Sequence, residues 1–460
     1  MTMDWEKAES WIMGSAWIDS LVSNHINTLC DDIGVRWGGS EGEKQAAKYI
    51  ISQFEKFGLD NIASEPFKLS TWECSSASIV IVGEEEKQID VRPSLFCPEI
   101  VVTGPLVDVG YGMAHEIQGL GQDLTGAIAL ITGAYEPFSP PEPLTNRLER
   151  LTNLGVAAAI TPYANGGRRT AHGSTNDWRD MQPGYTPLPT VHTSREDGSH
   201  LSRRATANNK VTVTVQAQQK EGKSLNNMGE LIGNIWPKET LLLGAHYDTT
   251  PDSPGANDNG SGTTVLLETS RILSGLNKKV GISPGRTIKF VTFGSEEQGL
   301  QGSDAYVRKH FGEDPKPNLM INLDELGTGT MKGVALQFPE LRFLVQRELD
   351  NMDEGLKCHV MAQMDASGDM YPFARNGIPS SMLWRWRFIG RHPDTGFGHS
   401  SSDTPDKVRT RELKEYSGLL ARLLFRLSHV NPVDWPENKL DVNKIESRIQ
   451  NERGSVVRTM

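Results

Sequence analysis

Residues 239–262 read Glu-Thr-Leu-Leu-Leu-Gly-Ala-His-Tyr-Asp-Thr-Thr-Pro-Asp-Ser-Pro-Gly-Ala-Asn-Asp-Asn-Gly-Ser-Gly, and this stretch decides the fold. Its short apolar run at 241–245, bounded by turn residues, predicts a buried strand that ends where His246 and Asp248 begin. A glycine-rich loop with Asp258 follows. Parallel sheets flanked by helices place ligands at the carboxyl ends of their strands, which favours a functional site here. A purely structural His-x-Asp pair is the alternative that this segment alone leaves open.

Two further predicted strands also end in residues that can bind metal. Residues 287–297 form a β-branched and aromatic run that ends in Glu296 and Glu297. A third run ends in Asp324, and His399 lies in the small-residue loop Gly-His-Ser-Ser-Ser-Asp-Thr. Two adjacent carboxylates repel each other and need a counter-charge, and a divalent metal is the simplest one.

The collected candidates are nitrogen and oxygen ligands without a thiolate, a set that suits zinc: His246, Asp258, Glu297, Asp324 and His399. One catalytic zinc usually takes three protein ligands and keeps an open position. Five ligands therefore predict two Zn²⁺ ions that share one bridging carboxylate. Glu296 lies beside a ligand without being required as one, so we expect it to act as the general base for a metal-bound water.

The order of these motifs resembles the co-catalytic di-zinc exopeptidases, a family that includes bacterial leucyl aminopeptidases and glutamate carboxypeptidases. The motifs are His-x-Asp, Gly-Ala-x-Asp-Asn-Gly-Ser-Gly, Glu-Glu-x-Gly-x-x-Gly-Ser, Asn-x-Asp and His-x-x-x-Asp-Thr, and they span about 160 residues. The resemblance implies that His246 and Asp324 hold one zinc and that Glu297 and His399 hold the other. It implies that Asp258 is the bridge.

The resemblance also implies that Glu296 is the general base and that Asp248 is the partner of the ligand histidine. Residues two apart on an extended chain share a face, so the Asp248 carboxylate can orient the imidazole of His246. The family further implies a cis peptide bond between Asp258 and Asn259.

Two ligand assignments have competitors within the sequence. Only the family pattern favours Asp324 over the neighbouring Glu325. His392 competes with His399, which is preferred because an aspartate and a threonine follow it at the family spacing.

The predicted fold class is α/β, a mixed and largely parallel sheet sandwiched by helices, with an inserted β-rich domain. Short β-like runs separated by Gly, Pro and Asp indicate the insertion, and its apolar strands and turns resemble a protease-associated domain. A cap that shapes the substrate cleft and a purely structural insert are both open interpretations. The predicted parts are 1–74, the start of the peptidase domain; 75–222, the insertion; 223–430, the catalytic zinc peptidase domain; and 431–460, a peripheral tail.

Helical patterns precede the insertion. Apolar residues at helical spacing predict an amphipathic helix over 17–30, and Ser40 with Glu43 forms a capping box before a second helix. Gly58 is the expected stop of that helix. We expect these N-terminal helices to pack on the sheet and to contribute nothing to catalysis.

Composition excludes some classes of partner. The 460 residues are 37% hydrophobic and 23% charged, with a net charge of −11, which argues against nucleic acid or an anionic membrane as a partner. We see neither a signal peptide nor an apolar run that approaches the roughly 20 residues of a membrane span. Four widely spaced cysteines favour the cytoplasm, with secretion as the alternative.

The predicted function is a zinc-dependent aminopeptidase acting on peptides. The alternative is a carboxypeptidase or dipeptidase of the glutamate carboxypeptidase type, in which Arg385, Arg387 or Arg391 clamps a substrate carboxylate; surface arginines over a core tryptophan are the plainer interpretation. A glycine at position 398, where that branch has an aromatic residue, favours the aminopeptidase. A glutaminyl cyclase-like acyl transferase and a non-catalytic receptor-like protein are more distant alternatives. The sequence does not specify the oligomeric state.

Overall fold

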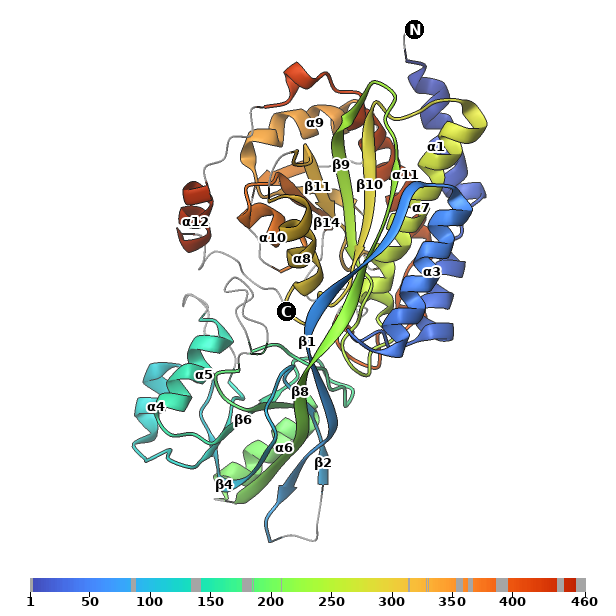
Figure 1. Ribbon diagram of the computed structural model, residues 1–460. Helices are drawn as coiled ribbons and strands as arrows, with labels where there is room; N and C mark the ends of the chain where they lie inside the picture. The colour runs from blue at the N-terminus through green and yellow to red at the C-terminus, as the bar shows by residue number, and fades with distance from the viewer. Residues whose placement is uncertain are drawn as a thin grey trace.

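The structure is a computed structural model that describes residues 3–83, 88–133, 142–175, 184, 186–207, 209–312, 315–327, 329, 331–352, 359–362, 367–385, 396–436 and 442–451. Figure 1 shows a larger part, in which long helices lie beside the central strands, and a smaller part around α4, α5 and α6. The two long strands β1 and β8 run from one part into the other.

Within the described residues, fourteen strands form one hydrogen-bonded network, whose main path has the order β13-β12-β14-β11-β9-β10-β8-β4-β5-β6-β7-β3, with β1 paired to β2 and β8. The strands are β1 (Asp60–Ile81), β2 (Gln88–Asp90), β3 (Arg92–Pro93), β4 (Ile100–Asp108), β5 (Ile128–Leu130), β6 (Ala158–Pro162), β7 (Thr190–Thr193), β8 (Lys210–Leu231), β9 (Trp236–His246), β10 (Arg286–Phe293), β11 (Leu319–Asn322), β12 (Met331–Leu336), β13 (His359–Ala362) and β14 (Ser380–Arg385). Around β9 the neighbours β10 and β11 are parallel to it, whereas β8 is antiparallel to β10 and β12 to β14. The predicted mixed, largely parallel sheet is confirmed.

Helices of the larger part cover both faces of its central strands, whereas α4, α5 and α6 lie in the smaller part (Figure 1). The described helices follow in chain order. They are α1 (Trp5–Ile18), α2 (Val22–Asn27), η1 (Thr28–Ile33), α3 (Glu41–Phe57), α4 (Ala114–Leu120), α5 (Leu144–Asn153), α6 (Arg195–Thr206), η3 (Ala256–Ser261), α7 (Gly262–Gly275), η4 (Leu276–Val280), α8 (Gln301–His310), η5 (Pro339–Leu341), α9 (Arg342–Asp350), α10 (Met370–Arg375), η6 (Pro405–Lys407), α11 (Thr410–Ser428), η7 (Pro432–Asp434) and α12 (Val442–Asn451). None of the described helices has the length and apolarity that a membrane span needs.

The second half of β9, residues 241–245, is apolar without alternation because both faces of the strand are buried there. Leu241 and Leu243 belong to the core shared with α1, α3, α7 and α11, whereas Leu242 belongs to a second core with residues of α8 and α10. Successive side chains of a strand point to opposite faces, so a strand covered on both sides must be apolar at every position.

The N-terminal helices differ partly from the prediction. The single helix expected over 17–30 is divided, because α1 ends at Ile18 and α2 begins at Val22. The second helix, α3, is confirmed with its signals: the Ser40 side chain accepts a hydrogen bond from the amide of Glu43, and Gly58 ends the helix with φ 67°.

Strands β1 and β8 are 22 residues each and pair antiparallel along nearly their whole length, with Lys68 opposite Lys223. They run without interruption through the boundaries predicted after residues 74 and 222. Beyond them, β3 to β7 with α4 to α6 bury two further apolar clusters, centred on residues such as Ile128 and Leu148. The division into four parts and the protease-associated identity of the insertion stay predictions.

Candidate metal centre

The carboxyl ends of three parallel strands bring the candidate ligands together. His246 is the last residue of β9 and lies opposite Phe293, the last residue of β10. Glu296 and Glu297 follow β10 after a two-residue turn, and Asp324 follows β11, which pairs with β9 on its other side. Since neighbouring parallel strands end at one edge of the sheet, residues distant in the sequence meet there.

Asp258 lies between two histidines. Its Oδ1 is 3.3 Å from Nε2 of His246, and its Oδ2 is 3.2 Å from Nε2 of His399. Each histidine has a second carboxylate beside it: Asp324 Oδ1 is 3.3 Å from His246 Nε2, and Glu297 Oε2 is 3.1 Å from His399 Nε2. These residues form two compact groups of potential ligands that share Asp258.

The carboxylate of Asp248 contacts residues at the ends of two neighbouring strands, β9 and β10. One of its oxygens lies 3.4 Å from Nδ1 of His246, and its carboxylate accepts hydrogen bonds from the amides of Glu296 and Glu297 at 3.0 and 3.2 Å. The side chain of Glu296 is buried, with Oε2 3.9 Å from His246 Nε2, and it is in neither ligand group. A carboxylate next to the ligands but outside both groups has the position of a proton acceptor.

The electrostatics of the cluster fit bound cations. Burial raises the pKa of Glu297, Asp324 and Glu296 above their ordinary values, and for Glu296 the nearby charge of Asp369 adds to this effect against the opposing charge of His246. Oε1 of Glu297 is buried without a hydrogen-bond partner among the described residues. Several buried carboxylates around two imidazoles are the donor set that zinc takes, and a divalent charge would offset their repulsion.

The loop that carries Asp258 is held by a carboxylate from the far end of the chain. Asp403 accepts hydrogen bonds from the backbone amides of Asn257 and Asp258, at 2.9 and 3.0 Å. The peptide bond between Asp258 and Asn259 is cis, as the resemblance implies. Sequence reasoning used Asp403 only to recognise His399 and missed this contact with the loop.

Arg36 supports the same region from the N-terminal segment, where no contribution was expected. Its side chain is fully buried, and its guanidinium donates hydrogen bonds of 2.8 to 3.0 Å to five backbone carbonyls, those of Leu29, Gly34, Tyr247, Pro254 and Gly255. Three of these carbonyls flank His246 and Asp258 along the chain. A helix-period analysis could not detect this role, because Arg36 lies in a loop.

Left-handed backbone conformations gather around the cluster. Ser295, Glu325 and His399 have φ values of 57°, 49° and 60°, and each lies at a candidate ligand or within two residues of one. Such conformations are uncommon for residues with side chains and persist where the surroundings fix them, which is typical of functional sites.

The two competing ligand assignments have different positions in the structure. The Asp324 carboxylate faces His246, whereas Glu325 accepts a hydrogen bond from the side chain of Asn257 at 3.3 Å. His392 lies outside the described residues. Of the predicted substrate arginines, Arg385 is the last residue of β14, and Arg387 and Arg391 lie outside the described residues.

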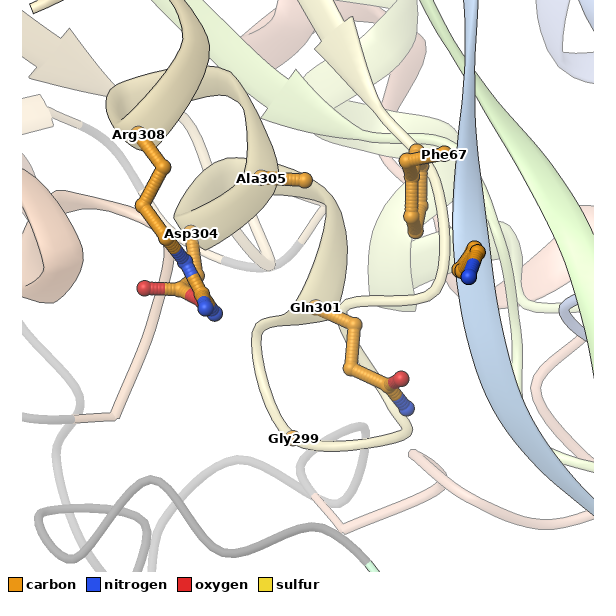
Figure 2. A pocket seen from close by; sticks show the side chains of 7 residues that line it. Phe67, Gly299, Gln301, Asp304, Ala305 and Arg308 are labelled. Carbon is orange, nitrogen blue, oxygen red and sulfur yellow. The ribbon is translucent and has the colours of Figure 1, made fainter.

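A separate pocket of about 330 Å³ lies between β1 and the start of α8 (Figure 2). None of its lining residues belongs to the candidate metal centre: Phe67, Lys68, Gly299, Gln301, Asp304, Ala305 and Arg308. The candidate chemistry therefore lies at the ligand cluster and not in this pocket.

Sequence and structure comparisons relate this chain to known peptidases. Residues 227–424 match the sequence model of peptidase family M28. The chain is 26% identical to aminopeptidase YwaD of Bacillus subtilis over 416 residues, which cover 87% of this chain and 83% of that protein. It is 23% identical to bovine carboxypeptidase Q over 384 residues, which cover 82% and 78% of the two chains. The structure of a zinc aminopeptidase from Bacillus subtilis superposes with a TM-score of 0.70 at 23% identity, covering 91% of this chain and 97% of that one, which confirms the fold.

Proposed function

We propose that this chain, in which residues 227–424 are a peptidase family M28 domain of the co-catalytic zinc exopeptidase type, removes residues from the amino termini of peptides. The chain is a metallo-exopeptidase, a hydrolase. The observation that carries the proposal is the position of Asp258, whose two oxygens face two different histidines, each with one more carboxylate beside it.

In this proposal His246 and Asp324 would hold one zinc ion, Glu297 and His399 would hold the other, and Asp258, which belongs to both groups, would be the shared ligand. When bound, two zinc ions supply a water of lowered pKa and polarise the scissile carbonyl. Asp248 orients the imidazole of His246 from the side that does not face the other ligands.

Glu296 is proposed to accept the proton of the attacking water and to return it to the leaving amine. The hydrogen bond from its amide to Asp248 fixes its backbone beside His246. Burial removes water that would compete for its carboxylate, and its raised pKa brings its proton affinity nearer to that of a base that works at neutral pH.

The acidic surroundings of the cluster support a substrate with a free α-amino group. A Cβ atom placed on Gly398 would lie 3.5 Å from Asp258 Oδ2 and 3.6 Å from Glu325 Oε1. Glycine at this position leaves the space beside the Glu325 carboxylate, which belongs to neither ligand group, without a side chain, and an ammonium group suits such a space electrostatically. Relatives named aminopeptidases point the same way.

The test is the hydrolysis of paired dipeptides, one with a blocked amino terminus and one with a blocked carboxyl terminus, with zinc and with a chelator. An aminopeptidase cleaves only the substrate with the free amine, and only with metal. Cleavage that requires a free carboxylate instead would overturn the proposal.

Glu296→Gln tests the proton acceptor. We expect kcat to fall by roughly 10²- to 10⁴-fold, the usual contribution of general acid–base catalysis, with zinc content unchanged. Glu340→Gln is the matched control, because Glu340 is exposed in η5. Near-wild-type turnover in Glu296→Gln would assign the proton transfer to another group.

A carboxypeptidase or dipeptidase is the second candidate. The carboxypeptidase Q relatives favour it, as do Arg385, Arg387 and Arg391, whose guanidinium groups suit a substrate carboxylate. The same dipeptide assay separates the two candidates.

The cytoplasm is our proposed compartment. Cys30, Cys74 and Cys97 are free thiols, and burial raises the pKa of Cys97 to about 12, which keeps it protonated and unreactive. Unpaired cysteines suit a reducing environment. The net charge of −11 argues against nucleic acid and anionic membranes as partners.

A further inference from the structure

The segment 163–172 of the insertion contacts the loop that carries His399. The hydroxyl of Tyr163 and the guanidinium of Arg169 both donate hydrogen bonds to the carbonyl of Gly396, at 2.6 and 3.2 Å. The guanidinium carbon of Arg169 also lies 4.5 Å from the ring centre of Phe397. Two side chains of the insertion thus contact Gly396 and Phe397, which shortly precede His399 in the chain.

His172, at the end of the same segment, contacts His399 itself. The amide of His172 donates to the carbonyl of His399 at 3.0 Å, and the carbonyl of His172 lies 3.2 Å from Nδ1 of His399. A carbonyl oxygen can only accept, so this contact places the proton of the neutral imidazole on Nδ1. Nε2 of His399, which faces Asp258 and Glu297, then carries the lone pair that a metal ligand needs.

His172 is in turn fixed within the insertion. Its side chain is buried, and its Nδ1 is 2.9 Å from the carbonyl of Pro93 in β3. Nε2 of His172 lies 3.7 Å from the carboxylate of Asp252, which also pairs with Arg92 at 2.9 Å. Asp252 belongs to the loop between β9 and η3, so the insertion is linked to two loops of the candidate metal centre.

We propose that the insertion positions the ligand His399, so that half of the metal centre depends on a residue outside the peptidase fold. His172 is the positioning residue, and Tyr163 and Arg169 hold the loop at the distance that its carbonyl requires. The inference rests on the proposed role of His399 as a zinc ligand. It gives the insertion a function distinct from shaping a substrate cleft.

The experiment measures zinc affinity in the full chain by competition with a fluorescent chelator, with zinc content after dialysis as a second readout. The double variant Tyr163→Phe with Arg169→Met removes both donors to Gly396 and the cation over Phe397. We expect one of two bound zinc ions to bind about 10- to 100-fold more weakly, the usual effect of losing an outer partner of a metal ligand, while the other ion is unaffected. Arg168→Met is the matched control, because Arg168 is 77% exposed and its guanidinium lies 4.0 Å from Asp197, a residue of the insertion itself.

His172→Ala and His172→Asn form a second pair. Asparagine can place a donor where Nδ1 of histidine lies, so we expect it to restore the affinity that alanine loses. Thermal unfolding of the zinc-free proteins separates a folding defect from weakened binding.

Wild-type affinity for both ions in the double variant and in a folded His172→Ala would overturn the inference. His399→Ala distinguishes this failure from failure of the proposed function. If His399→Ala still binds two zinc ions with wild-type affinity, the ligand assignment is wrong, and the positioning role falls with it.

Discussion

The carboxylate of Asp403 accepts a hydrogen bond from the backbone amide of Asp258, and its second oxygen holds the preceding amide. Asp403 therefore fixes the loop that carries the proposed bridging ligand Asp258, although the two residues are 145 apart in the sequence. Burial raises the pKa of Asp403 to about 7, so above that pH it is a carboxylate that only accepts.

Asp403→Asn replaces one of the two accepting oxygens with an NH₂ group. This donor then faces the backbone amide of Asn257 or Asp258, which is also a donor. At pH 8 we expect the free energy of unfolding to fall by about 1.5–3 kcal/mol, the usual value for a hydrogen bond to a charged group, together with weaker zinc binding. Urea unfolding and chelator competition measure the two effects. Asp406→Asn is the control, because Asp406 is mostly exposed; equal losses in both variants would contradict the role of Asp403.

Arg36→Lys removes a charged donor from five carbonyls, of which those of Leu29 and Gly255 also accept from the backbone amides of Gly34 and Gly260. A lysine has three N–H donors, so at least two of the five hydrogen bonds to a charged group are lost. Each costs about 1–3 kcal/mol, which predicts a loss of about 2–6 kcal/mol in urea unfolding. Arg308→Lys on the surface of α8 should change stability little; a similarly small change in Arg36→Lys would show that the loop does not need the guanidinium.

Glu43 makes stability depend on pH. Its carboxylate accepts from the amide of Gly39 at 2.6 Å and contacts Ser224 and Ser295, and burial raises its pKa to about 8. A carboxyl group with a raised pKa stabilises the fold fully below its unfolded value, about 4.3, and this contribution is lost as pH rises through 8.

The matching variant is Glu43→Gln, which cannot ionise. Between about pH 5 and 8 the wild type should lose up to about 1.4 kcal/mol per pH unit relative to Glu43→Gln. Urea unfolding across this range measures the difference. If the difference in unfolding free energy between the two proteins did not change with pH, Glu43 would have the same pKa in the folded and the unfolded state.

Removal of metal should destabilise the chain as well as inactivate it. Zinc at about 1,000 times its Kd stabilises the folded state by roughly 4 kcal/mol, and without it the buried carboxylates face each other uncompensated. Thermal unfolding before and after dialysis against a chelator should therefore show a lower Tm in the zinc-free protein. An unchanged Tm would argue against ions at this cluster.

The sequence predicts the parts of the site that follow strand ends. His246, Glu297 and Asp324 come at or shortly after the ends of apolar runs. Neighbouring parallel strands bring such residues to one edge of the sheet, whatever the order of the other strands. The signals that begin and end α3 are equally local, because Ser40 and Gly58 form hydrogen bonds with backbone groups only three or four residues away.

The supports of the site could not be predicted in this way. Arg36, Asp403 and His172 act through hydrogen bonds with backbone groups at distant positions. Every residue type has these backbone groups, so the sequence at the partner position does not reveal the contact. The sequence indicates only short β-like runs within β1 and β8. Their full length of 22 residues is not predicted, because the middle of β8 is polar and exposed and does not resemble a buried strand.

The pairing of β1 with β8 also bears on how such a chain could arise. The chain leaves the larger part along β1 and returns to it along β8, and positions such as Lys68 and Lys223 are direct neighbours on these strands (Figure 1). Recombination at two adjacent positions could therefore add or exchange the whole insertion without rerouting the recipient fold. Segment 163–172 limits that freedom, since any replacement would have to present a carbonyl to His399.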